Sequence, residues 1–177
     1  MQGFQKDGIV RRLSQLDDDL LSLYGPHVRF ELVIVGGSAL MMRELALQER
    51  FTTDIDVLKA SSEIEGLLER YDMNTNVSTF LYKFPENWEQ RRVQVPFEGQ
   101  VLDVYTLSHE DLAITKLLAG RAADKADLDA MRASGKLDMD RLQSILDDAA
   151  EVRINLEEEE WALLMDNLFL LREGGLL

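Results

Sequence analysis

Residues 33–58 read VIVGGSALMMRELALQERFTTDIDVL, and the fold prediction rests on this segment. A run of aliphatic residues leads into a double glycine, so residues 29–37 predict a strand that ends in a turn. The segment "SALMMRELAL" (38–47) consists of strong helix formers and predicts a helix. Residues 53–59, "TDIDVLK", alternate polar and apolar side chains, which indicates a second strand.

The second predicted strand carries Asp54 and Asp56. Residues i and i+2 of a strand point to the same face, so we expect both carboxylates to project together while Ile55 and Val57 enter the core. Two like charges this close are costly unless they are neutralised. Mg²⁺ would neutralise them, because it prefers carboxylate oxygens and completes its coordination with water and substrate phosphates. The alternative is a strand whose polar face is simply hydrated.

Gly36, Gly37 and Ser38 stand where the first strand ends and the helix begins. Glycine lets the backbone approach a ligand, and the start of a helix offers free N–H groups to a phosphate. Ser38 is expected to cap the helix or to donate its hydroxyl to a phosphate oxygen. The spacing of a Walker loop or of a Rossmann fingerprint is missing. A tight connection that binds no ligand is the alternative.

The rest of the chain predicts further helices and one more pair of strands. We expect a hairpin of strands at 91–97 and 100–107, joined at Glu98 and Gly99. Helices are expected at about 4–23, 61–71, 108–120, 122–133, 138–150 and 156–172. The order predicts an α+β fold, with a small mixed β-sheet flanked by helices and a helical C-terminal part. We expect one domain over residues 1–177, with an α/β core at about 25–107 and a helical tail at about 108–177 packed on it.

Composition limits the possible partners and the compartment. The net charge of −14, from 33 acidic and 19 basic residues, repels nucleic-acid phosphates and argues against a nucleic-acid partner. The absence of cysteine excludes disulfides, thiolate metal sites and a cysteine nucleophile. No apolar run is long enough for a signal peptide or a membrane span. We therefore expect a cytoplasmic protein with no membrane partner.

Taken together, the glycine turn and the acidic pair resemble the signature of nucleotidyltransferases of the DNA-polymerase-β superfamily. The most similar variant is that of the AbiEii-like toxins and their uncharacterised bacterial relatives, which share a GG-[ST]-A start and an R-x-T-x-D-x-D run. The matching residues are Gly36, Gly37, Ser38, Ala39, Arg50, Thr52, Asp54 and Asp56. The resemblance covers about residues 30–135.

The resemblance continues further along the chain. Asp103, on the strand expected at 100–107, stands where the superfamily keeps its third carboxylate. Residues 107–131 resemble the relatives' lysine-containing helix and the R-x-K-D-x-x-D-L stretch that follows it. The matching residues are Lys116, Arg121, Asp124 and Asp127, whereas Ala123 replaces a second lysine. From the residues alone, Lys116 either extends its charge to solvent or reaches a ligand, and the other three can equally form a solvated helix face.

The resemblance implies a nucleotidyltransferase that moves a nucleoside monophosphate from a nucleoside triphosphate to an acceptor. It assigns catalysis and two Mg²⁺ ions to Asp54, Asp56 and Asp103. It assigns nucleotide binding to Gly36, Gly37, Ser38, Arg50, Thr52, Lys116, Arg121 and Asp127. Toxin relatives suggest transfer to tRNA, whereas the charge of −14 favours a small-molecule or protein acceptor. The alternative is a non-catalytic protein of the same fold that senses nucleotides or serves as a toxin–antitoxin partner.

Overall fold

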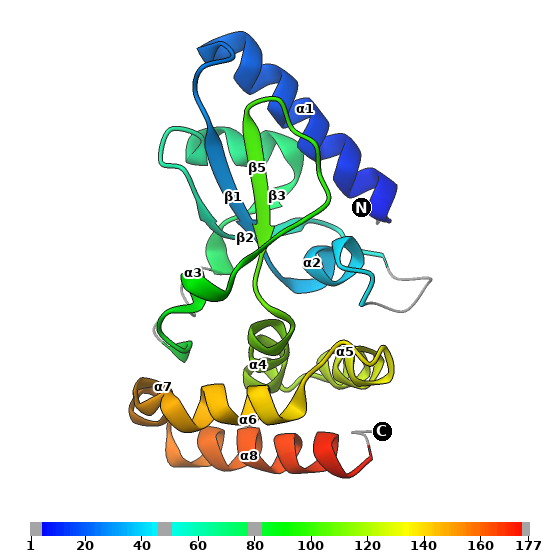
Figure 1. Ribbon diagram of the computed structural model, residues 1–177, viewed down its shortest axis with the longest axis vertical. Coiled ribbons are helices and arrows are strands. Elements are labelled where there is room, and N and C mark those ends of the chain that lie inside the picture. Colours follow the sequence, from blue (N-terminus) through cyan, green and yellow to red (C-terminus); the bar gives the residue numbers. More distant parts are fainter. Residues whose placement is uncertain (1–4, 46–50, 78–82, 175–177) are drawn as a thin grey trace. The chain divides into compact units, whose positions relative to one another are not determined.

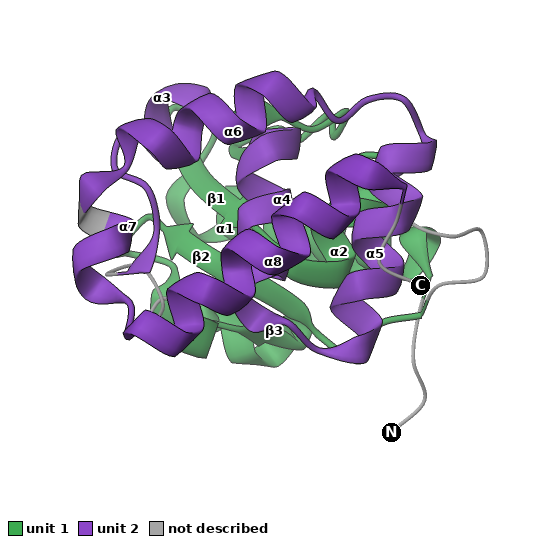
Figure 2. Ribbon diagram, turned by 90° about the horizontal axis from the view of Figure 1, so that it is seen from below, with its two compact units in different colours: residues 1–44, 48–79, 92–106 green, residues 45–47, 80–91, 107–177 purple. Residues whose placement is uncertain are grey.

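The computed structural model describes residues 5–45, 51–77 and 83–174. Within it the chain divides into two compact units, coloured separately in Figure 2. Unit 1 comprises residues 1–44, 48–79 and 92–106, and unit 2 comprises residues 45–47, 80–91 and 107–177. The expectation that all 177 residues form a single domain stays a prediction.

Unit 1 contains a five-stranded mixed sheet in the order β3-β2-β1-β5-β4. The paired strands β1 and β5 are seen side by side in Figure 1. Its strands are β1 (Phe30–Ile34), β2 (Ile55–Ala60), β3 (Met73–Asn74), β4 (Val93–Gln94) and β5 (Leu102–Thr106). The central strand β1 runs antiparallel to β2 and parallel to β5, while β3 is parallel to β2 and β4 is antiparallel to β5. The predicted small mixed sheet with flanking helices is therefore confirmed.

Three helical segments of unit 1 accompany this sheet: α1 (Lys6–Tyr24), α2 (Gly36–Met42) and the 3-10 helix η1 (Glu65–Tyr71). Helix α1 contacts both α2 and η1, and α2 contacts β2. The buried side of α1 carries apolar residues at the helical spacing that the sequence predicts: Ile9, Leu13, Leu16 and Leu20. Burial of this stripe, at about 25 cal/mol per Å² of apolar surface, holds α1 in unit 1.

A buried acid on α1 fixes the start of β5. Asp17 is 4% exposed, and its carboxylate accepts hydrogen bonds from three successive backbone N–H groups. The donors are Gln100 at 2.7 Å, Val101 at 2.9 Å and Leu102 at 2.8 Å. A buried carboxylate is stable only when such donors surround it, so this contact joins α1 to the sheet with a defined geometry.

The predicted hairpin forms, with strands shorter than expected. Strands β4 and β5 pair antiparallel, and one further bond from Val95 N–H to the Val104 carbonyl, at 3.0 Å, extends the pairing. Pro96 follows and has no N–H to continue the ladder. At Gly99 an added Cβ would lie 2.3 Å from the carbonyl oxygen of Leu102, so this connection requires glycine.

The helix after the glycine pair differs from the one expected at 38–47. Helix α2 begins earlier, at Gly36 with Val35 as its N-cap, and ends sooner, at Met42. The part of that prediction that falls on residues 46–50 lies outside the described residues.

Unit 2 is helical. Its elements are α3 (Trp88–Arg91), α4 (His109–Ala119), α5 (Ala122–Ala133), α6 (Met139–Asp148), α7 (Ala150–Asn155) and α8 (Glu158–Glu173). Helix α4 contacts α5, α6 and α8. It begins where Ser108 Oγ accepts the N–H of Asp111 and ends at Gly120, whose φ is 61°, so both predicted boundary signals are confirmed. The helix expected at 138–150 is broken at Ala149 into α6 and α7.

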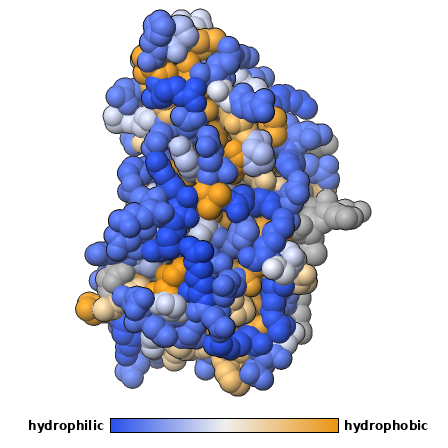
Figure 3. All heavy atoms as spheres, in the orientation of Figure 1, coloured by the Kyte–Doolittle hydropathy of each residue, from blue (hydrophilic) through white to orange (hydrophobic). Residues whose placement is uncertain are grey.

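The high content of charged residues in the sequence is reflected in a hydrophilic surface. The face of the molecule drawn in Figure 3 is mostly hydrophilic, with scattered apolar residues. Within the described ranges, no helix has the length and apolar character needed to span a membrane.

Candidate active site

The glycine turn of unit 1 lies directly against the carboxylate of Asp56. Gly36 has a φ of 65°, and a Cβ added there would stand 2.4 Å from Asp56 Oδ2. The backbone N–H of Val35 also donates to the carbonyl of Asp56, at 2.9 Å. Strand β2 and the start of α2 therefore meet at one point. Only glycine combines the left-handed conformation with this close approach.

Ser38 stabilises the turn itself. It is 1% exposed, and its hydroxyl donates a hydrogen bond to the carbonyl of Val35 at 2.9 Å. The prediction that Ser38 caps the helix is wrong, because α2 begins two residues earlier and Val35 takes the N-cap position without a side-chain bond. A serine hydroxyl has one proton, so in this arrangement Ser38 has none to donate to a phosphate.

The acidic pair spans the beginning of β2. Ile55 and Val57 are buried while Asp56 is half-buried, which confirms the alternation predicted for this strand. Asp54 immediately precedes the strand and is also half-buried. Thr52, expected to contact a nucleotide, donates its hydroxyl to the backbone carbonyl of Asp54 at 2.8 Å. Arg50, the other residue of this lead-in, lies outside the described residues.

A residue that the sequence did not single out joins this group. Asn74 on β3 is paired with Asp56 in the parallel register, and its Nδ2 donates to Asp56 Oδ1 at 3.2 Å. Residues 72–90 show little periodicity, and β3 has two residues, so no sequence signal marked Asn74. Asp56 is thus contacted from Gly36 on one side and from Asn74 on the other.

Asp103 does not join the acidic pair, contrary to the expected three-carboxylate arrangement. In the parallel register of β1 and β5, Asp103 lies opposite Glu31, at the beginning of β1. The backbone carbonyl of Asp56 accepts a hydrogen bond from the N–H of Val35, the residue just beyond the end of β1. Glu31 and Val35 are four positions apart, which is about 13 Å along a strand, and β1 separates β2 from β5. The physical reason is that β5 runs parallel to β1, so a residue near the start of β5 lies at the end of the sheet away from the glycine turn.

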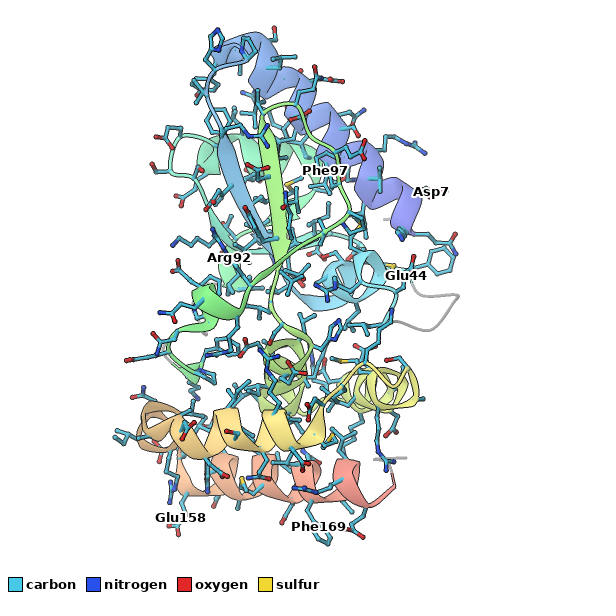
Figure 4. The ribbon with its side chains drawn as sticks, in the orientation of Figure 1. Asp7, Glu44, Arg92, Phe97, Glu158 and Phe169 are labelled. Carbon is cyan, nitrogen blue, oxygen red and sulfur yellow. The ribbon has the colours of Figure 1, made fainter. Side chains whose placement is uncertain are left out.

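The surroundings of Asp103 are those of a surface ion pair. The guanidinium of Arg29 bonds to both of its carboxylate oxygens, with Nε at 3.1 Å from Oδ2, and also donates to the Gln100 carbonyl at 2.7 Å. The hydrogen bond to Asp103 is the main reason that the pKa of Arg29 lies above its ordinary value. Arg92, the residue before β4 (labelled in Figure 4), lies with its guanidinium 4.2 Å from the ring centre of Tyr105 on β5. An ion pair and a cation–π contact between its own residues therefore stabilise this part of the sheet.

Unit 2 contains the remaining predicted residues, and three of them form a buried ion cluster. The ammonium of Lys116, on α4, lies 2.9 Å from Asp124 and 2.8 Å from Asp127, both on α5. The side chains are 5%, 1% and 1% exposed in that order. Lys116 therefore does not extend its charge to solvent, and the solvated helix face is wrong for Asp124 and Asp127. Arg121, the N-cap of α5, has a 72% exposed side chain that also bonds to Asp124 at 2.6 Å.

The charges of this cluster support one another. Burial by itself favours the neutral acid and is the largest single influence on Asp124. Hydrogen bonds from Arg121 and Lys116, with their positive charges, together outweigh it, so the pKa of Asp124 lies below its ordinary value. The carboxylate is therefore ionised in the folded protein at neutral pH.

A comparison with protein families identifies the family to which the chain belongs. The family described as nucleotidyltransferase of unknown function (DUF6036) matches residues 11–168. This chain is a member of that nucleotidyltransferase family. No curated protein matches the chain, and no solved structure matches it either. The finer assignment to the AbiEii-like group stays a prediction.

In this nucleotidyltransferase the carboxylate against the glycine turn is that of Asp56, and Asp54 stands two residues before it in the sequence. Among residues 5–45, 51–77 and 83–174, no three histidine, aspartate or glutamate side chains gather closely enough to hold a metal ion. A complete metal cage made of protein ligands is therefore not present in this part of the chain. The arrangement instead offers one carboxylate, that of Asp56, directly against a glycine turn.

Proposed function

We propose that this family member is a Mg²⁺-dependent nucleotidyltransferase that transfers a nucleoside monophosphate from a nucleoside triphosphate to an acceptor hydroxyl. The observation that carries the proposal is the contact between Gly36 and the Asp56 carboxylate. The missing side chain of Gly36 lets a carboxylate, the ligand type that Mg²⁺ prefers, lie directly against the turn at which α2 begins.

The donor set at this turn fits Mg²⁺. Asp54 and Asp56 are two residues apart at the start of β2, and both are half-buried. Mg²⁺ is usually held by one or two carboxylates and completes its octahedron with water and substrate phosphates, so two aspartates suffice. Bound there, Mg²⁺ would supply neutralisation of the phosphate charge. Asp103 lies at the other end of the sheet, so Asp54 and Asp56 are the carboxylates that would hold Mg²⁺.

The side chains and the turn would act by positioning. Asp54 and Asp56 would hold the Mg²⁺ that neutralises the triphosphate, and the backbone from Gly36 to Ser38 would lie against the phosphates. The acceptor oxygen forms a bond to the α-phosphorus, the bond between the α-phosphorus and the bridging oxygen breaks, and pyrophosphate leaves with that electron pair. The acceptor's proton passes to water. Such a reaction needs little covalent chemistry from the protein and depends on placement and charge.

The residues of unit 2 that were predicted to contact the nucleotide differ in their exposure and in their charge partners. The charge of Lys116 is already matched by two buried carboxylates, Asp124 and Asp127. Of the residues in that stretch, Arg121 has the exposed side chain, and the nucleotide contacts expected of Lys116, Arg121 and Asp127 stay predictions. The net charge of −14 supports a small-molecule or protein acceptor rather than a nucleic acid.

The position of Asp103 favours a second candidate, a nucleotide sensor or toxin–antitoxin partner without turnover. Its register opposite Glu31 separates it from the acidic pair, so the three carboxylates of the superfamily are not assembled. A protein with two of them could bind a nucleotide with Mg²⁺ and still transfer nothing.

Labelled nucleotides separate these two functions. The chain would be incubated with each nucleoside triphosphate carrying ³²P at the α-phosphate, with Mg²⁺, and with or without cell extract. The enzyme transfers label to an acceptor and releases pyrophosphate, and Asp56→Asn loses this activity by about 100-fold or more. Asp103→Asn is the matched control and keeps it. Nucleotide binding in calorimetry without any label transfer would support the sensor, and transfer by Asp56→Asn would overturn the proposed site.

A further inference from the structure

Asn74 and Asp56 are neighbours across two strands. The parallel pairing of β2 and β3 places Asp56 beside Asn74, so their side chains leave the same face of the sheet. Asn74 Nδ2 donates a hydrogen bond of 3.2 Å to Asp56 Oδ1. This contact joins an unassigned residue to the carboxylate on which the proposed function rests.

The orientation of the Asn74 amide is fixed by the backbone. The N–H of Asn76 donates to Asn74 Oδ1 at 3.0 Å. A backbone N–H can bond only to an acceptor, so the oxygen of the amide must face Asn76 and the NH₂ group must face Asp56. The bond from Asn76 therefore fixes the Asn74 side chain as the donor in its contact with Asp56.

The other carboxylate oxygen of Asp56 is confined by the glycine turn. A Cβ on Gly36 would stand 2.4 Å from Oδ2, so this oxygen lies closely against the bare Cα of the turn. With Oδ1 held by Asn74 and Oδ2 held at the turn, the carboxylate has one preferred rotation about its Cβ–Cγ bond.

The chemistry of the amide suits a metal ligand. A lysine or arginine at position 74 would oppose the charge of Asp56, whereas a neutral amide orients the carboxylate without adding a charge of its own. We propose that Asn74 is a positioning residue that holds Asp56 in the orientation needed to bind a divalent cation. This inference rests on the proposed function.

The test uses the full chain and measures metal binding as well as turnover. Asn74→Ala removes the amide, and Asn74→Leu keeps its size without its polar atoms. Mn²⁺ binding would be followed by electron paramagnetic resonance and Mg²⁺ binding by calorimetry, both with a nucleoside triphosphate present. We expect both variants to bind each ion about 10-fold more weakly, the effect typical of groups that orient metal ligands. The Mg²⁺ concentration for half-maximal transfer should rise by the same factor, with kcat at saturating Mg²⁺ changed by less than about threefold.

Asn76→Ala is the matched control. It removes an exposed side chain from the same segment and keeps the backbone N–H that orients Asn74, so it should bind both ions like the unmodified chain. If Asn74 had a purely structural role, its variants would have a lower melting temperature but would not combine weaker Mg²⁺ binding with a nearly unchanged kcat. Wild-type ion affinity in Asn74→Ala and Asn74→Leu, with affinity lost in Asp56→Asn, would overturn the inference and leave the proposed function standing.

A second measurement does not depend on any variant folding. In the ¹⁵N-labelled unmodified chain, Mg²⁺ with a nucleoside triphosphate should shift the side-chain NH₂ signals of Asn74 more than those of Asn76. Signals of Asn74 that stay in place would overturn the inference. If Asp56→Asn binds both ions as the unmodified chain does, the proposed function and the inference both fail.

Discussion

The ammonium nitrogen of Lys116 lies 2.8 Å from Oδ2 of Asp127, and both side chains are almost fully buried in unit 2. Asp124 joins them at 2.9 Å from the same nitrogen, so one cation sits between two carboxylates. The three groups are mutually dependent, because each would be costly in the interior without the others.

Lys116→Met should therefore be strongly destabilising. The substitution keeps an aliphatic chain of similar length but leaves Asp124 and Asp127 buried without the lysine's charge. We expect the free energy of unfolding, measured by urea denaturation, to fall by about 3–5 kcal/mol. Arg121→Ala is the comparison, since its side chain is 72% exposed and its loss should cost about 1 kcal/mol or less. Equal losses in the two variants would show that burial of the cluster does not determine its contribution.

The same cluster predicts an acid sensitivity. The folded-state pKa of Asp124 lies below its ordinary value of 3.8, so its ionised form is favoured by folding. The stability this supplies is fully present above pH 3.8 and is lost as the pH falls from there through the folded pKa. Thermal melts between pH 2.5 and 7 should show a smaller decline for Asp124→Asn than for the unmodified chain over that acidic range. Parallel curves would contradict the assignment.

Asp17 gives a prediction for unit 1. Its carboxylate accepts from the backbone N–H groups of Gln100, Val101 and Leu102, and Asp17→Ala leaves buried donors without that partner. We expect a loss of about 3 kcal/mol or more in the free energy of unfolding, because each buried unpaired group costs about 1–3 kcal/mol. Asp18→Ala changes the adjacent, exposed residue and should stay within about 0.5 kcal/mol of the unmodified chain. A similar loss from Asp18→Ala would contradict the role of the three bonds.

The sequence predicts the features that depend on neighbours along the chain. The alternation of Ile55, Asp56 and Val57 is local, and the strand forms with the expected residues inside. Ser108 and Gly120 act on the ends of α4 through bonds within a few residues, so both ends are predictable. Such signals fix the type of an element and its exposed side without knowledge of the rest of the fold.

The features that the sequence does not predict depend on pairing between distant segments. Asp103 lies away from Asp56 because of the register of β5 against β1, which no local pattern specifies. Lys116 is buried because its partners are on the next helix, and the residue pattern of α4 does not specify them. Asn74 belongs to a strand of two residues, too short for any periodicity, and only its pairing with β2 brings it to Asp56.

Gly36→Ala tests the turn that carries the proposed function. Alanine is strained at a φ of 65°, which costs about 1–2 kcal/mol, and its Cβ would stand 2.4 Å from Asp56 Oδ2. The carboxylate must then move, so we expect Mn²⁺ binding and nucleotidyl transfer to fall by about 100-fold, because misplacement of a reacting group by about 1 Å costs that much. Gly66→Ala is the matched control. An added Cβ there meets nothing within 4 Å, so both measurements should be unchanged. If Gly36→Ala folds and retains metal binding and transfer, the close approach of the turn to Asp56 is not required, and the site must lie elsewhere.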